Sequence, residues 1–328
     1  MPGDSEADAG TGIEVVASRM LEPALQRERA SNLWASFDRK FPPIHKATEF
    51  EARPSVGVEQ IGGLAAAKEE VLTYACAATD PEVYARWGTW APSALLLIGR
   101  EGVGKTLLGK ALATRSGTAF VRVVVPRLVL EIVHRGGQIG ELLEQWSATL
   151  AEMPPLTLFF DELEFSLAEE IGAQRPDLPV GPIMDFLLDL VDRSIHVEHT
   201  LVVGSTSHPD TLRRAFLAPR RFERVVEVAP LVPGDVVEAL QIHQRAAEER
   251  AGRKLFESID WARVVGSYAE PATGEWVRMM HAVLRRKARC EAASETEGPV
   301  TTTDLLHEVE RLRQTKGRLA QPGGGVYL

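Results

Sequence analysis

Residues 99–106 read GREGVGKT and carry the spacing G-x-x-x-x-G-K-[ST] of a phosphate-binding loop. Glycines let such a loop fold round phosphate groups, and the unpaired NH groups at the start of the following helix attract the anion. In this pattern Lys105 reaches the outer phosphates and the hydroxyl of Thr106 ligates Mg²⁺. The octamer predicts that the chain binds a nucleoside triphosphate.

A second group of chemically active residues follows about 55 positions later, where the apolar run 156–160 ends in Asp161 and Glu162. At the end of a strand beside a phosphate loop, these two carboxylates are expected to have different roles. Asp161 would hold Mg²⁺ through its water shell, and Glu162 would orient and polarise the water that attacks the γ-phosphorus. The pair predicts hydrolysis of the bound nucleoside triphosphate.

The elements around these residues predict an α/β fold with a parallel sheet covered by helices on both faces. Residues 93–98 form an apolar run typical of a buried strand, and 106–113 read as a helix with Leu107, Leu108 and Ala111 facing inward. Helical patterns separate most of the further strand candidates, and the ligand of such a sheet lies at the carboxyl ends of its strands. These further candidates are 120–125, 156–160, 201–203 and 225–228.

Sequence patterns before and after the predicted sheet indicate further helices and linkers. Apolar positions at helical spacing between Ile13 and Phe41 indicate two short amphipathic helices, interrupted by Pro23, that pack on their own module or serve as a partner-binding arm. Pro42, Pro43 and Pro54 mark a linker, and the pattern from about Pro233 is helical only. The expected domains are a disordered tip (1–12), a helical N-terminal segment and linker (13–55), an α/β domain (56–232), an all-helical domain (233–318) and a flexible tail (319–328).

Composition narrows the class of protein. The 328 residues are 45% hydrophobic, which suits about two domains, and the net charge of −9 argues against non-specific binding along nucleic acid. Basic clusters at 213–214 and 285–287 are read as solvated helix faces. Two cysteines, Cys76 and Cys290, cannot form a disulfide framework, and no signal peptide or membrane span is apparent. We therefore expect a cytoplasmic protein with no membrane partner.

From about residue 58 to 316 the chain resembles the AAA branch of the AAA+ ATPases. VEQIGGL at 58–64 is similar to the family's opening segment near the adenine, DELE at 161–164 resembles D-E-x-D, and QIH at 241–243 matches a motif in the helical lid whose histidine approaches the nucleotide. The resemblance implies ATP and Mg²⁺ as cofactors, with Thr106 and Asp161 at the metal. The nucleotide-binding residues that it implies are Ile61, Gly62, Gly99, Glu101, Gly102, Val103, Gly104, Lys105, Thr106, Leu107 and His243.

Three segments that concern hydrolysis and its coupling between subunits depart from the family pattern. The sensor segment, normally T-N-x-P-D, reads TSHPD, so that Ser207 replaces an asparagine that orients water. The arginine-finger segment, normally L-R-P-G-R-F-D, reads LAPRRFE, with Ala218 in place of one arginine and Arg220 added. The resemblance implies that Arg221 reaches the γ-phosphate of a neighbouring subunit, in a homo-oligomeric ring that we expect to be hexameric. Asp192 and Arg193 replace the family's D-G signalling pair, so coupling between subunits is expected to be altered.

Two further segments concern partners. Where threading enzymes of the family carry an aromatic pore residue, this chain reads EIVHRGG at 131–137, so either Ile132 and His134 provide a weaker grip or the subunit does not thread polypeptide. The C-terminal Val326, Tyr327 and Leu328 follow a glycine-rich tether. They resemble the tail with which proteasomal AAA ATPases dock on the 20S core particle, although a frayed end and a segment captured by its terminal carboxylate remain open.

Three functions are compatible with these observations. One is a ring ATPase that remodels a protein partner, with Lys105, Glu162, Arg221, Arg220 and Ser207 as its catalytic residues. Another is a proteasome-associated activator. The last is a nucleotide-gated assembly or scaffold protein with little turnover, which the departures at Ser207, Ala218 and the pore segment would suit.

Overall fold

The computed structural model describes residues 23–135, 139–164, 180–212, 214–218, 221–293 and 298–319. The chain divides into two compact units. The first comprises Met1–Gly57, Ala67–Gly99 and Lys105–Glu227, and the second comprises Val58–Ala66, Arg100–Gly104 and Val228–Leu328. None of the helices in the described residues is long and apolar enough to cross a membrane. The predicted domain boundaries remain predictions.

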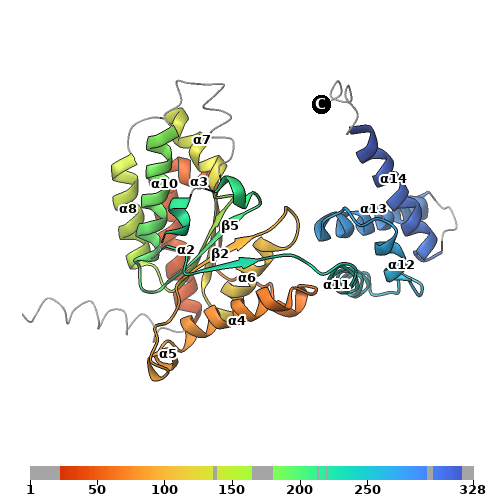
Figure 1. The fold of residues 1–328 in the computed structure, drawn as a ribbon, viewed down its shortest axis with the longest axis horizontal. Coiled ribbons are helices and arrows are strands. Elements are labelled where there is room, and N and C mark those ends of the chain that lie inside the picture. Colours follow the sequence, from red (N-terminus) through yellow and green to blue (C-terminus); the bar gives the residue numbers. More distant parts are fainter. Residues whose placement is uncertain are drawn as a thin grey trace, which may run out of the picture. The chain divides into compact units, whose positions relative to one another are not determined.

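The first unit is built on a six-stranded sheet in the order β1-β3-β4-β5-β2-β6 (Figure 1). All neighbouring strands are parallel except β1 and β3, which are antiparallel. The predicted α/β fold is confirmed, since five strands coincide with the predicted apolar runs. Their bounds are β1 Thr48–Glu51, β2 Ala94–Ile98, β3 Ala119–Val124, β4 Leu156–Asp161, β5 Thr200–Thr206 and β6 Arg224–Glu227.

Helices of the first unit cover this sheet on both faces, as the sequence predicts (Figure 1). They are α2 Pro23–Lys40, α3 Pro42–Ala47, α4 Ala65–Thr79, α5 Glu82–Arg86, α6 Lys105–Ser116, α7 Val125–Arg135, α8 Ile139–Glu152 and α10 Val180–Ile195, with short 3₁₀ turns at Pro209–Thr211 and Arg214–Leu217. A third 3₁₀ turn, Val58–Gln60, belongs to the second unit.

The segment from α2 to β1 packs into the first unit. Trp34 on α2 is 2% exposed and its ring lies 6.0 Å from that of Trp146 on α8. The predicted linker is wrong in part, because Pro42 and Pro43 begin α3 and the chain then enters the sheet as β1. Proline is tolerated in the first turn of a helix, where its missing NH has no partner to lose. Of the two predicted N-terminal helices, the second is present as α2, and residues 1–22 lie outside the described part.

The opposite face of the sheet is covered by α6, the helix that follows the phosphate loop. Leu108 and Ala111 are fully buried, but Leu107 is 40% exposed, so the prediction that Leu107 faces inward is wrong. The closest approach of α6 to the sheet is instead at Gly109, where an added Cβ would lie 2.4 Å from the ring of Phe159 on β4. This close approach fixes α6 against β4, the strand that leads to the acidic residues.

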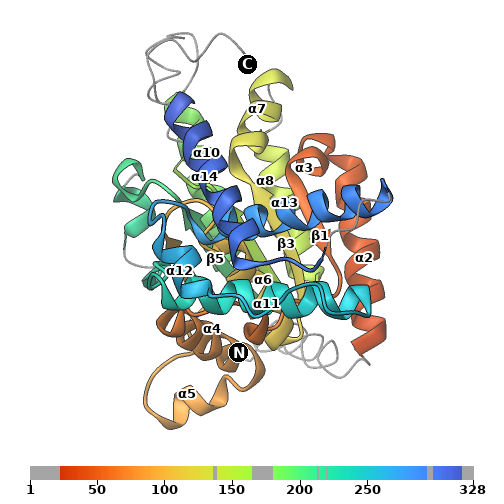
Figure 2. The ribbon, with the colours of Figure 1, turned by 90° about the vertical axis from the view of Figure 1, so that its right-hand side faces the viewer.

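The second unit contains α11 Gly234–Ala251, α12 Trp261–Gly266, α13 Thr273–Ala292 and α14 Thr302–Leu319 (Figure 2). A core that includes Leu240, Trp276 and Met280 joins them. Residues 58–64 pack on α11: an added Cβ at Gly62 would lie 2.2 Å from the backbone nitrogen of Ala239. The backbone NH of Leu64 donates to Asp235 at 3.0 Å.

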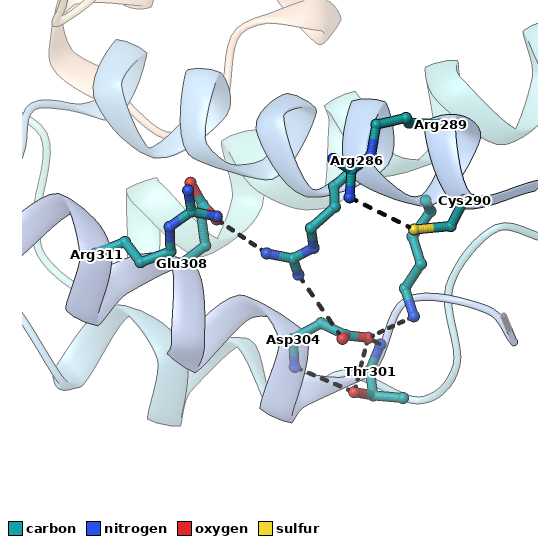
Figure 3. Close-up of polar contacts among 8 residues, drawn as sticks. Arg286, Arg289, Cys290, Thr301, Asp304, Glu308 and Arg311 are labelled. Atoms are coloured by element: carbon teal, nitrogen blue, oxygen red, sulfur yellow. Dashed lines mark hydrogen bonds and ion pairs between the residues drawn. The ribbon is translucent and has the colours of Figure 1, made fainter. Parts of the chain in front are cut away.

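A polar network between α13 and α14 holds the start of α14 (Figure 3). The hydroxyl of Thr301 accepts from the backbone NH of Asp304 at 3.1 Å, while Asp304 Oδ2 accepts from the backbone NH of Thr301 at 2.9 Å, so Thr301 caps the N-terminus of α14. Arg286 and Lys287 on α13 lie 3.8 and 3.1 Å from the same carboxylate. Although burial acts to raise the pKa of Asp304, these hydrogen bonds and the Lys287 cation hold it below its ordinary value.

Candidate active site

The phosphate loop leaves the carboxyl end of β2 and enters α6. Its backbone has φ of +74° at Gly102 and +110° at Gly104, in the left-handed region that residues with a Cβ rarely adopt. The NH of Gly99 donates to the carbonyl of Thr206 at 3.1 Å, which ties the start of the loop to the carboxyl end of β5. Gly102 and Gly104 are therefore needed for the shape of the loop.

Lys105 begins α6 and brings the loop together with the sensor segment. Its side chain is largely buried, and Nζ donates to the carbonyl of Gly99 at 2.5 Å and to the hydroxyl of Ser207 at 2.8 Å. Because an ammonium group loses hydration when it is buried, these oxygens stabilise its charge. Two residues predicted independently, from the loop and from the sensor, thus lie in direct contact.

Asp161 and Glu162 lie at the carboxyl end of β4, as the sequence predicts. Asp161 Oδ1 accepts a hydrogen bond of 2.5 Å from the hydroxyl of Ser205, which is also 3.3 Å from the backbone nitrogen of Glu162. Glu162 has φ of +61°, a conformation that costs energy for a residue with a side chain and that is often found at functional sites. Ser205 therefore fixes both the carboxylate and the turn that follows it.

Arg122 on β3 is a site residue that the sequence reasoning missed. Its Nε donates to Asp161 Oδ2 at 2.8 Å, and its Nη1 donates to the carboxylate of Glu49 at 3.0 Å. Burial acts to lower the pKa of Arg122, but the hydrogen bonds and charges of Asp161 and Glu49 outweigh it and raise the pKa. The available signal was a single cation within the apolar run AFVRVV, since a charge in a buried strand requires a partner.

Glu164, the last residue of DELE, connects β4 to the sensor segment. Its Oε1 accepts from the backbone NH of Ser207 at 3.0 Å and lies 3.3 Å from Nδ1 of His208. Its Oε2 is buried without a hydrogen-bond partner among the residues that the structure describes. This longer acid fixes the backbone from which Ser207 contacts Lys105.

Arg221 contacts its own chain through a fork of hydrogen bonds. Nε and Nη2 donate to the two carboxylate oxygens of Asp192, at the end of α10, at 2.5 and 2.7 Å, and Nη1 donates to the carbonyl of Ala215. The hydrogen bond with Asp192 raises the pKa of Arg221, and burial only partly offsets it. The two residues that the sequence assigned to subunit coupling therefore form one ion pair, while Arg220 lies outside the described residues.

Several of the predicted nucleotide-binding residues belong to the second unit, and their burial and contacts there are as follows. Ile61 and Val103 are buried and Glu101 is exposed, while the carbonyl of Gly102 accepts from the NH of Gly274 at the start of α13 at 2.8 Å. His243 lies on α11.

The ring of His243 meets that of His281 edge to face, with centroids 6.1 Å apart. Burial, and then the nearby His281 and Arg250, lower the pKa of His243 and favour its neutral form.

The donor set fits Mg²⁺. Thr106 supplies a hydroxyl in the first turn of α6 and Asp161 supplies a carboxylate, and both are hard oxygen ligands. Within the described ranges, no group of three or more His, Cys, Asp or Glu side chains could form a metal site by itself. This sparse set suits Mg²⁺, which commonly binds through one or two carboxylates together with waters and substrate phosphates.

Comparison with known proteins agrees with this geometry. Residues 95–230 match the model of the family "ATPase family associated with various cellular activities (AAA)". Residues 95–230 form an ATPase domain of the AAA family. The match spans the sheet from β2 to β6, including the phosphate loop, Asp161, Glu162, Ser207 and Arg221.

Several relatives are named proteasome-activating nucleotidases. The chain is 28% identical over 278 residues to that of Methanocaldococcus jannaschii, covering 83% of this chain and 60% of the relative. It is 30% identical over 280 residues to that of Thermococcus onnurineus (82% and 64%) and 27% identical over 321 residues to that of Aeropyrum pernix (94% and 73%). The chain thus spans about three fifths of the length of the first two relatives.

Proposed function

We propose that the chain binds ATP with Mg²⁺ and hydrolyses it as one subunit of a homo-oligomeric ring that remodels or moves a protein partner. The observation that carries the proposal is the contact of Lys105 with both Gly99 and Ser207, beside the strand that ends in Asp161 and Glu162. A cation, a hydrogen-bonding hydroxyl and two carboxylates at one edge of a parallel sheet are the groups that phosphoryl transfer to water requires.

Each side chain has a distinct task in this proposal. Lys105 would release the carbonyl of Gly99 and bind the outer phosphates, while Ser207 would hydrogen-bond the γ-phosphate or the attacking water. Thr106 and Asp161 would hold Mg²⁺, which supplies neutralisation of phosphate charge when bound. Glu162, on its strained turn, would orient and polarise the water.

The proposed ring rests on Arg221 and its partner Asp192. A planar guanidinium that donates through a fork suits the equatorial oxygens of a transferring phosphoryl group, and we assign this role to Arg221 toward a neighbouring subunit. The relatives are named proteasome-activating nucleotidases. Action on a proteasome favours an assembly of subunits over an isolated subunit. Six subunits are the proposed number.

The test is the ATP hydrolysis rate per subunit as a function of protein concentration. We expect the rate to rise with concentration and to reach a plateau, because each site is completed by an arginine of a neighbour. Size-exclusion chromatography with light scattering at the same concentrations should show assembly in step with the rate. A rate per subunit that is independent of concentration while the protein remains monomeric would contradict the ring.

A second candidate function, docking on a 20S proteasome, is favoured by the name of the relatives and by the residues Val326, Tyr327 and Leu328. The tail lies outside the described residues, as do Gly136 and Gly137 of the pore segment. Deletion of the last three residues is expected to abolish co-sedimentation with 20S particles in ATP while the rate of ATP hydrolysis is retained. Equal co-sedimentation of the full-length and shortened proteins would contradict docking through the tail.

A further inference from the structure

Arg122 bridges two carboxylates from its place in the sheet. Nε and Nη2 lie 2.8 and 2.6 Å from Asp161 Oδ2, and Nη1 lies 3.0 and 3.1 Å from the two carboxylate oxygens of Glu49. Asp161 is 8% exposed at its side chain, Arg122 is 25% exposed and Glu49 is 48% exposed. The charges therefore form a row from solvent at Glu49 to the buried metal ligand.

The register of the strands fixes this row. Glu49 on β1 lies directly opposite Arg122 on β3, and Arg122 lies opposite Phe159, two residues before Asp161 on β4. Because side chains alternate along a strand, Asp161 shares the face of Phe159 and Arg122. This is the face that α6 covers, as the close approach of Gly109 to Phe159 indicates. All three charges are therefore positioned by strands of the sheet rather than by a loop.

The arrangement has consequences for cation binding by Asp161. Its Oδ2 accepts from Nε of Arg122 and lies 2.6 Å from Nη2 of the same guanidinium, while its Oδ1 accepts from Ser205. The guanidinium therefore occupies Oδ2, and a further ligand would approach Oδ1. The guanidinium fixes which oxygen faces a ligand, and its positive charge opposes a second cation at the same carboxylate. The negative charge of Glu49 offsets part of that opposition.

We propose that Arg122 is a positioning residue that sets the affinity of Asp161 for Mg²⁺, with Glu49 moderating its effect. The inference rests on the proposed function, because it concerns the metal of the same nucleotide site. Arg122 contacts the metal ligand rather than the nucleotide or the water. Its removal should therefore change the Mg²⁺ dependence of nucleotide binding in a direction set by charge.

The experiment titrates Mg²⁺ into the full-length protein at a fixed concentration of a fluorescent ATP analogue. The readout is the Mg²⁺ concentration that gives half of the binding signal. We expect Arg122→Gln to lower this Mg²⁺ concentration about three- to tenfold, because a positive charge next to Asp161 is removed. We expect Glu49→Gln to raise it about twofold, because the negative charge that it removes is more distant and more exposed. Arg122→Lys, which keeps the charge, should stay within about twofold of wild type.

The matched control is Lys110→Gln. Lys110 pairs with Glu51, two residues along β1 from Glu49, and this pair does not include Asp161. Its replacement should leave the midpoint unchanged. A loss of fold alone would raise the midpoint in both Arg122→Gln and Glu49→Gln, so shifts in the same direction, or no shift, would overturn the inference.

Thermal melting checks the fold, because Arg122→Gln leaves a buried carboxylate without its counter-charge. If that variant does not fold, Glu49→Gln must still raise the midpoint and Arg122→Lys must still preserve it, or the inference fails. A wild-type protein that binds no analogue at any Mg²⁺ concentration would overturn the proposed function as well. Wild-type binding with unshifted variants would overturn the inference alone.

Discussion

Replacement of Glu162 by Gln is expected to lower the rate of ATP hydrolysis about 10²- to 10⁴-fold and to leave ATP affinity within about threefold of wild type. Glutamine keeps the size of the side chain and can occupy the same strained turn, but it cannot accept a proton from water. Steady-state hydrolysis and equilibrium binding of a fluorescent ATP analogue, measured on the same preparation, separate the two effects. The result would assign Glu162 to the chemical step.

Lys105→Ala provides the comparison for this experiment. Because Lys105 is the cation of the phosphate loop and contacts both Gly99 and Ser207, its loss should abolish binding and hydrolysis together. Glu144→Gln, which changes an exposed acid on α8, should change neither quantity.

The same variants separate a motor from a nucleotide-gated scaffold. Loss of biological function in both Glu162→Gln and Lys105→Ala would favour the motor. If Glu162→Gln retains biological function while Lys105→Ala loses it, the result would favour a scaffold protein with little turnover.

The sequence predicts the sheet and the phosphate edge well because the signals are local. Each of β2 to β5 contains a short apolar run, and GREGVGKT places its own strand, loop and helix. Strand β1 gives no such signal: TEFE is short and polar, and it becomes a strand through pairing with β3 at the edge of the sheet. Pairing between distant segments is decided by tertiary packing.

The contacts within the site are less accessible to sequence reasoning. Asp161 is visible from its motif, but Arg122 and Ser205 acquire their roles only when β3, β4 and β5 lie side by side. Likewise Asp192 and Arg221 are 29 residues apart, and nothing local indicates that they form an ion pair. Chemistry that depends on one motif can be predicted from spacing, whereas chemistry that depends on strand order requires the fold.

The ion pair between Arg221 and Asp192 leads to the second large effect. Arg221→Ala is expected to lower the hydrolysis rate of the assembled protein about 10³-fold or more, with little change in ATP affinity, because it removes a cation that acts only as charge develops in transfer. Arg221→Lys should recover only a small part of the rate, since an ammonium cannot reproduce the fork that Asp192 holds. Arg224→Ala, which removes an exposed partner of Glu70, is the matched control and should retain the rate.

Mixing variants distinguishes action on a neighbour from action within the subunit. A subunit with Arg221→Ala still carries Glu162, and a subunit with Glu162→Gln still carries Arg221, so an interface between them contains one complete site. Preparations that are each inactive should therefore regain activity when they are mixed and allowed to exchange subunits. A mixture no more active than the sum of its components, under conditions where exchange is demonstrated, would mean that Arg221 serves its own subunit and that Asp192 holds it as a structural ion pair.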